Sequence, residues 1–232
     1  MILVVDSGST KTDWIALDNE GEEIFSTQTL GLNPQMLSNE ILNERIKNNF
    51  DIYKNRKLVN KLFFYGAGCG VKDTQNRILK VFKSIFVNSE FDIKEDTYAA
   101  VYSAVDKGIP SIVNIIGTGS NCSYYDGKNV IQKVQSLGYV LMDYASGNYY
   151  GKYLIRAYYF NKMPESLRDE FSNNYDLSPN SIKNKLYREE NPNTYLAGFA
   201  RFLIENKSNE YFKEIIFKGL ERFIDYQILQ YD

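Results

Sequence analysis

The spacing of apolar residues in the first half of the chain alternates between the periods of strands and helices. Apolar runs predict strands at residues 2–5, 13–18, 22–30 and 90–96, and a strand that runs into a glycine loop at residues 61–70. Helical spacing predicts helices at residues 38–50, 73–86 and 97–108, the second with Asp73 as N-cap and the third closed by Gly108. This order is typical of an α/β unit with a mixed sheet.

The same strand pattern starts again near residue 111. A strand, a glycine turn, a second strand, a hairpin turn at Asp126 and Gly127 and a third strand are predicted between residues 111 and 134. This order repeats the opening of the chain and indicates a weak internal duplication. From about Tyr144 the pattern is almost entirely helical and rich in Tyr and Phe, which we expect to pack between helices.

Composition narrows the chemistry that the chain can perform. The 232 residues carry a net charge of -2 and include no histidine, which excludes Ser-His-Asp triads, Cys-His pairs and zinc sites built on histidine. No basic face is evident, so nucleic acid is not an expected partner. No apolar run approaches the roughly 20 residues of a membrane helix, and the N-terminus has no secretion signal, so we expect a cytoplasmic protein without a membrane partner. Cys69 and Cys122 are expected to be reduced and partly buried.

The first strand ends in Asp6, and a turn of small residues follows it. Backbone amides in such a turn suit anionic oxygens, Gly8 allows close approach, Ser9 and Thr10 add hydroxyl donors, and Lys11 adds a positive charge. Asp6 would repel a bare phosphate, but it suits a magnesium ion, which binds carboxylates and phosphates together. The turn does not match a Walker A loop.

Two further positions suggest nucleotide chemistry. The turn from Gly117 to Ser120, which includes Thr118 and Gly119, has the same character as the first, and two such turns in two similar units suggest a clamped phosphate chain. Asp96 lies where a strand ends and a helix begins. It could be a helix N-cap or a general base that deprotonates a hydroxyl attacking a terminal phosphate.

Six stretches, in their order along the chain, carry a resemblance to a known family. They are "DSGSTKTDW", "GLNP", "FFYGAGCG", the Asp of "KEDTYAA", "GTGSNC" and "LGYVLMDYASGNYYGK". Together they resemble the N-acetylglucosamine kinase and BadF/BadG/BcrA/BcrD ATPase family of the sugar kinase, Hsp70 and actin superfamily. The resemblance implies an actin-like ATPase fold of class α/β, with two ribonuclease H-like domains with mixed sheets at residues 1–109 and 110–232, the second domain helix-rich.

The resemblance also implies roles for individual residues. Asp6 is similar to the carboxylate that organises magnesium, through water, and Asp96 matches the catalytic base, which favours the base over the cap. The sugar site would include Asn33, Gly68, Asp96 and Asp143. The first phosphate loop would be formed by Ser7, Gly8, Ser9, Thr10 and Lys11, and the second by Gly117, Thr118, Gly119 and Ser120.

The chain departs from the family pattern in two places. Where the family reads "LGDEGSG", residues 141–147 read "LMDYASG", so that Met142, Tyr144 and Ala145 replace Gly, Glu and Gly. The loss of glycine restricts the backbone angles that are accessible there. Relatives also continue with further strands beyond the last predicted helix, and we therefore expect the second domain to be truncated.

The resulting prediction is an ATP-dependent sugar kinase that uses ATP and Mg²⁺. The expected substrate is an amino sugar, above all N-acetylglucosamine, phosphorylated at its primary hydroxyl, and a homodimer is compatible with the resemblance. Two alternatives are an ATPase of the BadF type, which needs an iron–sulfur cluster held by cysteines, and a catalytically silent module that binds sugar or nucleotide.

Overall fold

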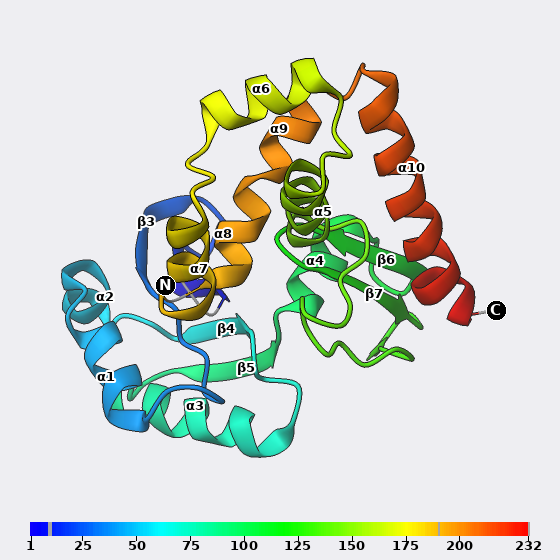
Figure 1. Ribbon diagram of the computed structural model, residues 1–232. Coiled ribbons are helices and arrows are strands. Elements are labelled where there is room, and N and C mark those ends of the chain that lie inside the picture. Colours follow the sequence, from blue (N-terminus) through cyan, green and yellow to red (C-terminus); the bar gives the residue numbers. More distant parts are fainter. Residues whose placement is uncertain (9–10, 190, 232) are drawn as a thin grey trace. The chain divides into compact units, whose positions relative to one another are not determined.

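The computed structural model describes residues 1–8, 11–189 and 191–231, and it divides into two compact units (Figure 1). The first unit spans Met1–Lys107 and the second spans Gly108–Asp232. Ser9 and Thr10 of the predicted first phosphate loop lie outside the described residues.

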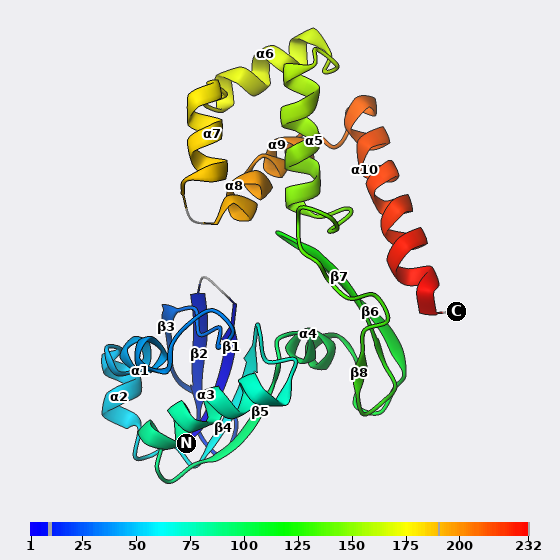
Figure 2. The same ribbon diagram turned by 60° about the horizontal axis from the view of Figure 1, so that its bottom comes forward.

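A five-stranded mixed sheet forms the centre of the first unit (Figure 2). Strand β1 pairs antiparallel with β2 and parallel with β4, which pairs parallel with β5, and the strand order is β3-β2-β1-β4-β5. Because β1, β4 and β5 run parallel, their carboxyl ends meet at one edge, where Ser7, Gly66 and Glu95 are in register. The strands are β1 Ile2–Ser7, β2 Lys11–Leu17, β3 Glu23–Leu30, β4 Lys61–Gly66 and β5 Glu90–Glu95.

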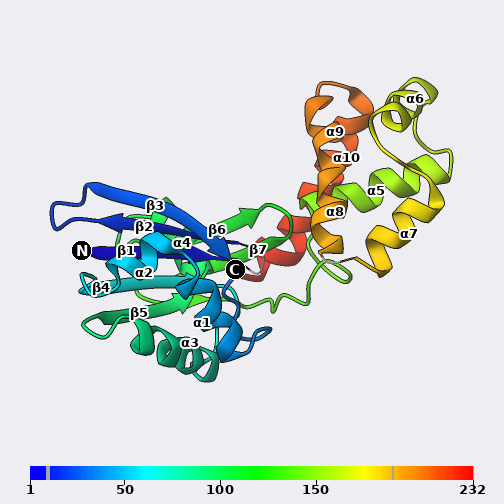
Figure 3. The same cartoon turned by 90° about the vertical axis from the view of Figure 1, so that its left-hand side faces the viewer.

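Alternation along the strands builds the core of this unit. Leu3 and Val5 of β1 and Trp14 of β2 are almost fully buried, as expected for residues two apart on one face of a sheet. Helices α1 and α3 pack side by side on the sheet (Figure 3), and Phe82 of α3 meets the Trp14 ring edge-on at 6.4 Å. The helices are α1 Asn39–Lys47, α2 Phe50–Asn55, α3 Lys72–Ile85 and α4 Thr97–Ala104.

Three details of the predicted helices were wrong. Helix α3 begins at Lys72 with Val71 at the N-cap, so Asp73 lies in the first turn, where its charge suits the helix dipole without capping the helix. Helix α4 ends at Ala104 because Val105 is extended, and Gly108 lies in a later turn at φ +88°. The sequence pattern also missed that the chain breaks after α1, where the Asn49 side chain caps α2.

The second unit starts with an antiparallel meander. Among the described residues its strands have the order β6-β7-β8 and pair only antiparallel, so the mixed pairing belongs to the first sheet. The predicted hairpin turn is confirmed, because Gly127 has φ +96° and the Asp126 carboxylate accepts backbone hydrogen bonds from Lys128 and Asn129. The strands are β6 Ser111–Ile116, β7 Ser120–Tyr125 and β8 Val130–Ile131.

Helices form the rest of the second unit, and aromatic side chains pack between them as predicted. The Phe171 ring lies 5.1 Å from Phe202, 5.8 Å from Phe199 and 5.0 Å from Tyr175. No helix in the described part of the chain is both long and apolar enough to cross a membrane. The α-helices are α5 Gly147–Tyr159, α6 Glu165–Asn174, α7 Pro179–Tyr187, α8 Pro192–Gly198, α9 Ala200–Glu205 and α10 Glu210–Phe223; a π-helical turn, Ile224–Ile228, and a 3-10 turn, Leu229–Tyr231, follow.

Candidate functional site

Asp6 lies near the end of β1, next to the carboxylate of Asp13 on the neighbouring strand β2. The antiparallel register places it directly opposite Asp13 of β2, and like charges in such a pair repel. Burial and the Asp13 charge raise the pKa of Asp6, and Lys11 lowers it in part. The Lys11 ammonium lies 3.0 Å from the Asp13 carboxylate. A divalent cation would relieve the repulsion between these carboxylates, so this corner fits magnesium.

Ser7 points to the opposite face of the sheet and is fully buried. Its Oγ lies 2.8 Å from Thr12 Oγ1 and accepts a hydrogen bond from the Leu32 backbone at 3.0 Å. The Gly8 amide donates to the Lys11 carbonyl at 3.0 Å and closes the turn. The Ser7 hydroxyl therefore holds β1, β2 and the segment after β3 together and does not face the Asp6 side.

Asn33 and Gly68 lie against each other. Asn33 is 7% exposed, and its Oδ1 accepts a hydrogen bond from the Gln35 amide at 2.9 Å. Gly68 has φ +80°, and a Cβ placed on it would lie 2.2 Å from Asn33 Oδ1. The Arg77 guanidinium donates to the Leu37 carbonyl at 2.8 Å and ties this loop to α3. Only glycine fits at position 68, so the two loops form one closely packed corner.

Asp96 is the N-cap of α4 and also lies in the acidic corner at the end of β5. Its Oδ1 accepts a hydrogen bond from the Thr97 amide at 2.9 Å. Burial raises the pKa of Asp96; the Thr97 hydrogen bond opposes this shift, and the Asp6 charge adds to it. Burial, together with the charges of Asp96 and the neighbouring Glu95, raises the pKa of Cys69, which precedes Gly70 in the glycine loop. The structure thus brings Asp6, Asp96 and the loop that contains Gly68 together within the first unit.

The second glycine turn is attached to the start of α5. The Gly117 and Thr118 carbonyls accept hydrogen bonds from the Gly147 and Asn148 amides at 2.8 and 3.0 Å. The Ser120 hydroxyl donates to the Tyr144 carbonyl at 2.7 Å. The turn is therefore held on both sides by the segment that contains Asp143.

Asp143 lies against Gly119 in this turn. A Cβ on Gly119 would lie 2.7 Å from the Asp143 carboxylate, so any larger residue here would displace that carboxylate. Asp143 is 7% exposed at φ 66°, and its Oδ2 accepts a hydrogen bond from Asn148 Nδ2 at 3.1 Å. The Asn148 side chain is fully buried, and its Oδ1 has no hydrogen-bond partner among the described residues. A buried acceptor of this kind suits a ligand that donates a hydrogen bond.

Two of the residues that depart from the family pattern, Tyr144 and Ala145, directly follow Asp143. Ala145 has φ 62°, a left-handed conformation that glycine adopts without cost and that alanine does not. The Tyr144 ring lies 5.5 Å from Tyr149 and 5.3 Å from Tyr226, so it packs among aromatic residues. The fold keeps the left-handed conformation at Ala145 even without the glycine.

Sequence reasoning did not single out Asp13, Glu95 or Asn148. Asp13 lies between the buried residues Thr12 and Trp14, so the period of the strand predicts that its side chain is on the opposite face of the sheet from theirs. Its pairing with Asp6, however, depends on the register of β1 and β2. Glu95 directly precedes Asp96, and burial and the Asp96 charge raise its pKa. Asn148 follows Gly147 at the start of a helix, and its burial and its contact with Asp143 distinguish it from an ordinary first-turn residue.

Comparison with solved structures identifies the fold. The chain is similar to a protein from Porphyromonas gingivalis described as a "putative N-acetylglucosamine kinase", with 29% identity, a TM-score of 0.88 and coverage of 100% of this chain and 82% of that one. A Chromobacterium violaceum protein with the same description has 15% identity and a TM-score of 0.64, with coverage of 95% of this chain and 79% of that one. No protein-family model and no curated protein sequence matches the chain. The resemblance to N-acetylglucosamine kinases and the actin-like fold that it implies are confirmed.

Proposed function

We propose that the protein is an ATP-dependent sugar kinase that phosphorylates an amino sugar, N-acetylglucosamine, at its primary hydroxyl. The observation that carries this proposal is the acidic corner of the first unit. Asp6 lies near the carboxyl end of β1 and Asp96 directly follows β5, two strands of the parallel part of the sheet, and the Asp6 charge adds to the raised pKa of Asp96. Ligands of α/β proteins bind at this edge of the sheet. The similarity to a structure described as a "putative N-acetylglucosamine kinase" supports the choice of substrate.

Asp96 is the general base of this proposal. It accepts the proton of the sugar hydroxyl as the hydroxyl oxygen bonds to the terminal phosphorus of ATP, and the bond from that phosphorus to ADP breaks. A raised pKa strengthens a carboxylate as a base. The hydrogen bond from the Thr97 amide fixes the carboxylate at the helix start, so its orientation is set before the substrate arrives.

The remaining residues bind and orient the substrates. Asp6 would hold Mg²⁺, through water, and the ion would neutralise charge on the ATP phosphates. Asn33 would bind a sugar hydroxyl through its side-chain amide, with Gly68 closing the loop against it. In the second unit, the backbone of the turn from Gly117 to Ser120 would bind phosphate oxygens, and Asp143 would contribute to the sugar site.

The cysteines disfavour the alternative of a cluster-bearing ATPase. Cys69 and Cys122 are both buried, and burial raises the pKa of Cys69 to about 12 and that of Cys122 to about 11. Thiolates are the form that binds iron–sulfur clusters. Neither thiol is in an environment that favours this form.

A coupled assay of ADP release with ATP, Mg²⁺ and a panel of sugars tests the proposal. We expect turnover with N-acetylglucosamine and none with its 6-deoxy analogue, which lacks the accepting hydroxyl, and the product should be the 6-phosphate by NMR. Turnover of the 6-deoxy sugar would contradict the proposed position. Sugar binding in calorimetry without ADP release would instead indicate the silent module.

A further inference from the structure

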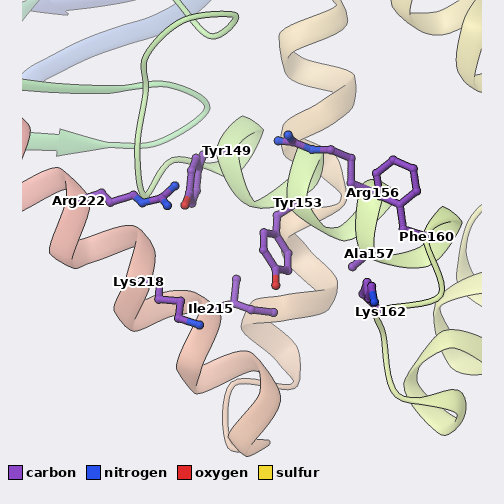
Figure 4. Close-up of a pocket in the computed structure, with 9 residues that line it drawn as sticks. All are labelled: Tyr149, Tyr153, Arg156, Ala157, Phe160, Lys162, Ile215, Lys218 and Arg222. Atoms are coloured by element: carbon purple, nitrogen blue, oxygen red, sulfur yellow. The ribbon is translucent and has the colours of Figure 1, made fainter.

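A groove between α5 and α10 lies within the second unit and is not part of the sites described above. Its volume is about 360 Å³, which is within the range of small-molecule sites. Figure 4 shows its walls, with Tyr149 and Tyr153 on α5 and Ile215, Lys218 and Arg222 on α10. Ala157 and Phe160 extend the apolar wall toward the end of α5.

The two walls are built by helical spacing. Tyr149, Tyr153 and Arg156 follow one another at intervals of four and three residues, as do Ile215, Lys218 and Arg222 at three and four, so each set shares one helix face. The two helices are joined by a hydrogen bond that the Tyr150 hydroxyl donates to the Ile216 carbonyl at 3.1 Å.

The charged side chains that line the groove are all cationic in the described part of the chain. Arg156, Lys162, Lys218 and Arg222 line it, and no acidic residue does so in the described part of the chain. The chain as a whole has more acidic than basic residues, 29 against 27, so this concentration is local. Glu214 pairs with Lys218 at 2.6 Å, but both side chains are more than 60% exposed, and exposed pairs of this kind contribute little.

Aromatic rings lie beside these cations. Figure 4 shows the Arg222 side chain reaching from α10 toward Tyr149 on α5, and Lys218 directed toward Ile215 and Tyr153. The Arg222 guanidinium also lies 5.9 Å from the centre of the Tyr144 ring. Flat rings and cations on two facing walls suit a ligand that has a flat apolar body and an anionic group.

We propose that the groove between α5 and α10 is a binding site for a small aromatic anion, separate from the candidate phosphate loops. The tyrosines and Ile215 would contact the flat body of the ligand, and Lys218 and Arg222 would pair with its anionic group. This inference does not depend on the kinase activity, because it rests on residues that have no role in the proposed reaction.

The test uses a matched pair of fluorescent probes on the whole chain. The anion 1-anilinonaphthalene-8-sulfonate should bind at one site per chain, and the neutral N-phenyl-1-naphthylamine should bind much more weakly. The double variant Lys218→Gln/Arg222→Gln should lower the affinity for the anion roughly tenfold. The double variant Lys183→Gln/Arg188→Gln, which changes two exposed cations on and after α7, should not.

Three outcomes would overturn the proposal. They are equal binding of the neutral and anionic probes, unchanged affinity in the Lys218→Gln/Arg222→Gln variant, and displacement of the anionic probe by Mg-ATP, which would assign the groove to the nucleotide. Because both replaced side chains are exposed, the variant should fold, and an unchanged melting temperature checks this. Tyr153→Leu provides a second measurement and should weaken anion binding through the lost ring.

Discussion

Asp96 serves two purposes with one carboxylate. As an N-cap it accepts the Thr97 amide, a contact that stabilises a helix. Its burial, together with the nearby Asp6, raises its pKa, which means that the ionised form is held at a cost to stability. The two roles that the sequence suggests for Asp96, helix cap and general base, are therefore compatible. The cap needs one carboxylate oxygen and leaves the other for a substrate.

Replacing Asp96 by Asn separates these purposes. Asn caps a helix as well as Asp does, but it cannot accept a proton, so we expect turnover in the ADP-release assay to fall by roughly 100-fold or more with little change in sugar affinity. Unchanged turnover would return Asp96 to a capping role alone. Glu40→Gln, which changes an exposed carboxylate in α1, is the control.

The same variant should alter the pH dependence of stability. Because the folded state raises the pKa of Asp96 above its ordinary value of 3.8, the folded state holds the proton more tightly, and stability falls as pH rises between the two values. Asp96→Asn removes this loss, so urea unfolding at pH 7 should show equal or greater stability than the parent. The advantage should shrink toward pH 4, and an advantage that grows on acidification would contradict the assignment.

Asn33 tests the sugar site. Asn33→Ala should weaken sugar binding by about 1–3 kcal/mol, because a buried hydroxyl would lose its hydrogen-bond partner, and nucleotide affinity should hardly change. Calorimetry with sugar and with ATP measures both. Asn19→Ala, in the exposed β2–β3 turn, is the control. An unchanged sugar affinity would contradict a role of Asn33 in sugar binding and would indicate a structural role, such as accepting the hydrogen bond from the Gln35 amide.

At the scale of elements, glycine sets how closely the helices of the second unit approach one another. A Cβ on Gly151 of α5 would lie 1.8 Å from the Leu196 carbonyl of α8, which is far inside contact distance. Gly198, at the end of α8, has no atom within 4 Å of such a Cβ. Neither glycine has a positive φ, and only Gly151 is packed against another helix.

Gly151→Ala and Gly198→Ala form a matched pair. The first should destabilise the protein by about 1–3 kcal/mol or more, because α5 and α8 must separate. The second should be neutral or stabilising by up to about 1 kcal/mol, because alanine favours a helix over glycine. Urea unfolding followed by circular dichroism measures both, and equal effects would show that the contact between α5 and α8 adds nothing.

At the scale of the molecule, each unit has its own hydrophobic core. The two sets of buried side chains have no residue in common among those described. Trp14, the single tryptophan of the chain, is fully buried in the first core. Helices α5 to α10 lie in the second unit, so circular dichroism is weighted toward that unit.

The separate cores predict separable unfolding. Leu154→Ala, which opens a cavity in the second core, should destabilise that unit by about 2–5 kcal/mol and shift the dichroism transition, while tryptophan fluorescence changes little. Ile78→Ala in the first core should shift the fluorescence transition instead. If both probes shift together in both variants, the units unfold as one cooperative body.

The sequence by itself determined the order of strands and helices in the first unit, apart from the separate helix α2, the strands that open the second unit, and the position of Asp6 and Asp96 at strand ends. These follow from local periods and from small-residue turns, which depend on neighbours in the chain. The hairpin at Gly127 was predictable for the same reason. Where a single residue decides a boundary, as at Asp73 or Gly108, the local signal was ambiguous and the prediction was wrong.

Only the tertiary structure decided which side chains meet. The pairing of Asp6 with Asp13 depends on strand register, the packing of Gly68 on Asn33 depends on two loops that are 35 positions apart, and the contact of Asp143 with Gly119 depends on how α5 starts. The groove between α5 and α10 likewise joins residues about 60 positions apart. Periodicity shows which face a residue occupies, whereas long-range contacts are set by packing of whole elements, which no local pattern encodes.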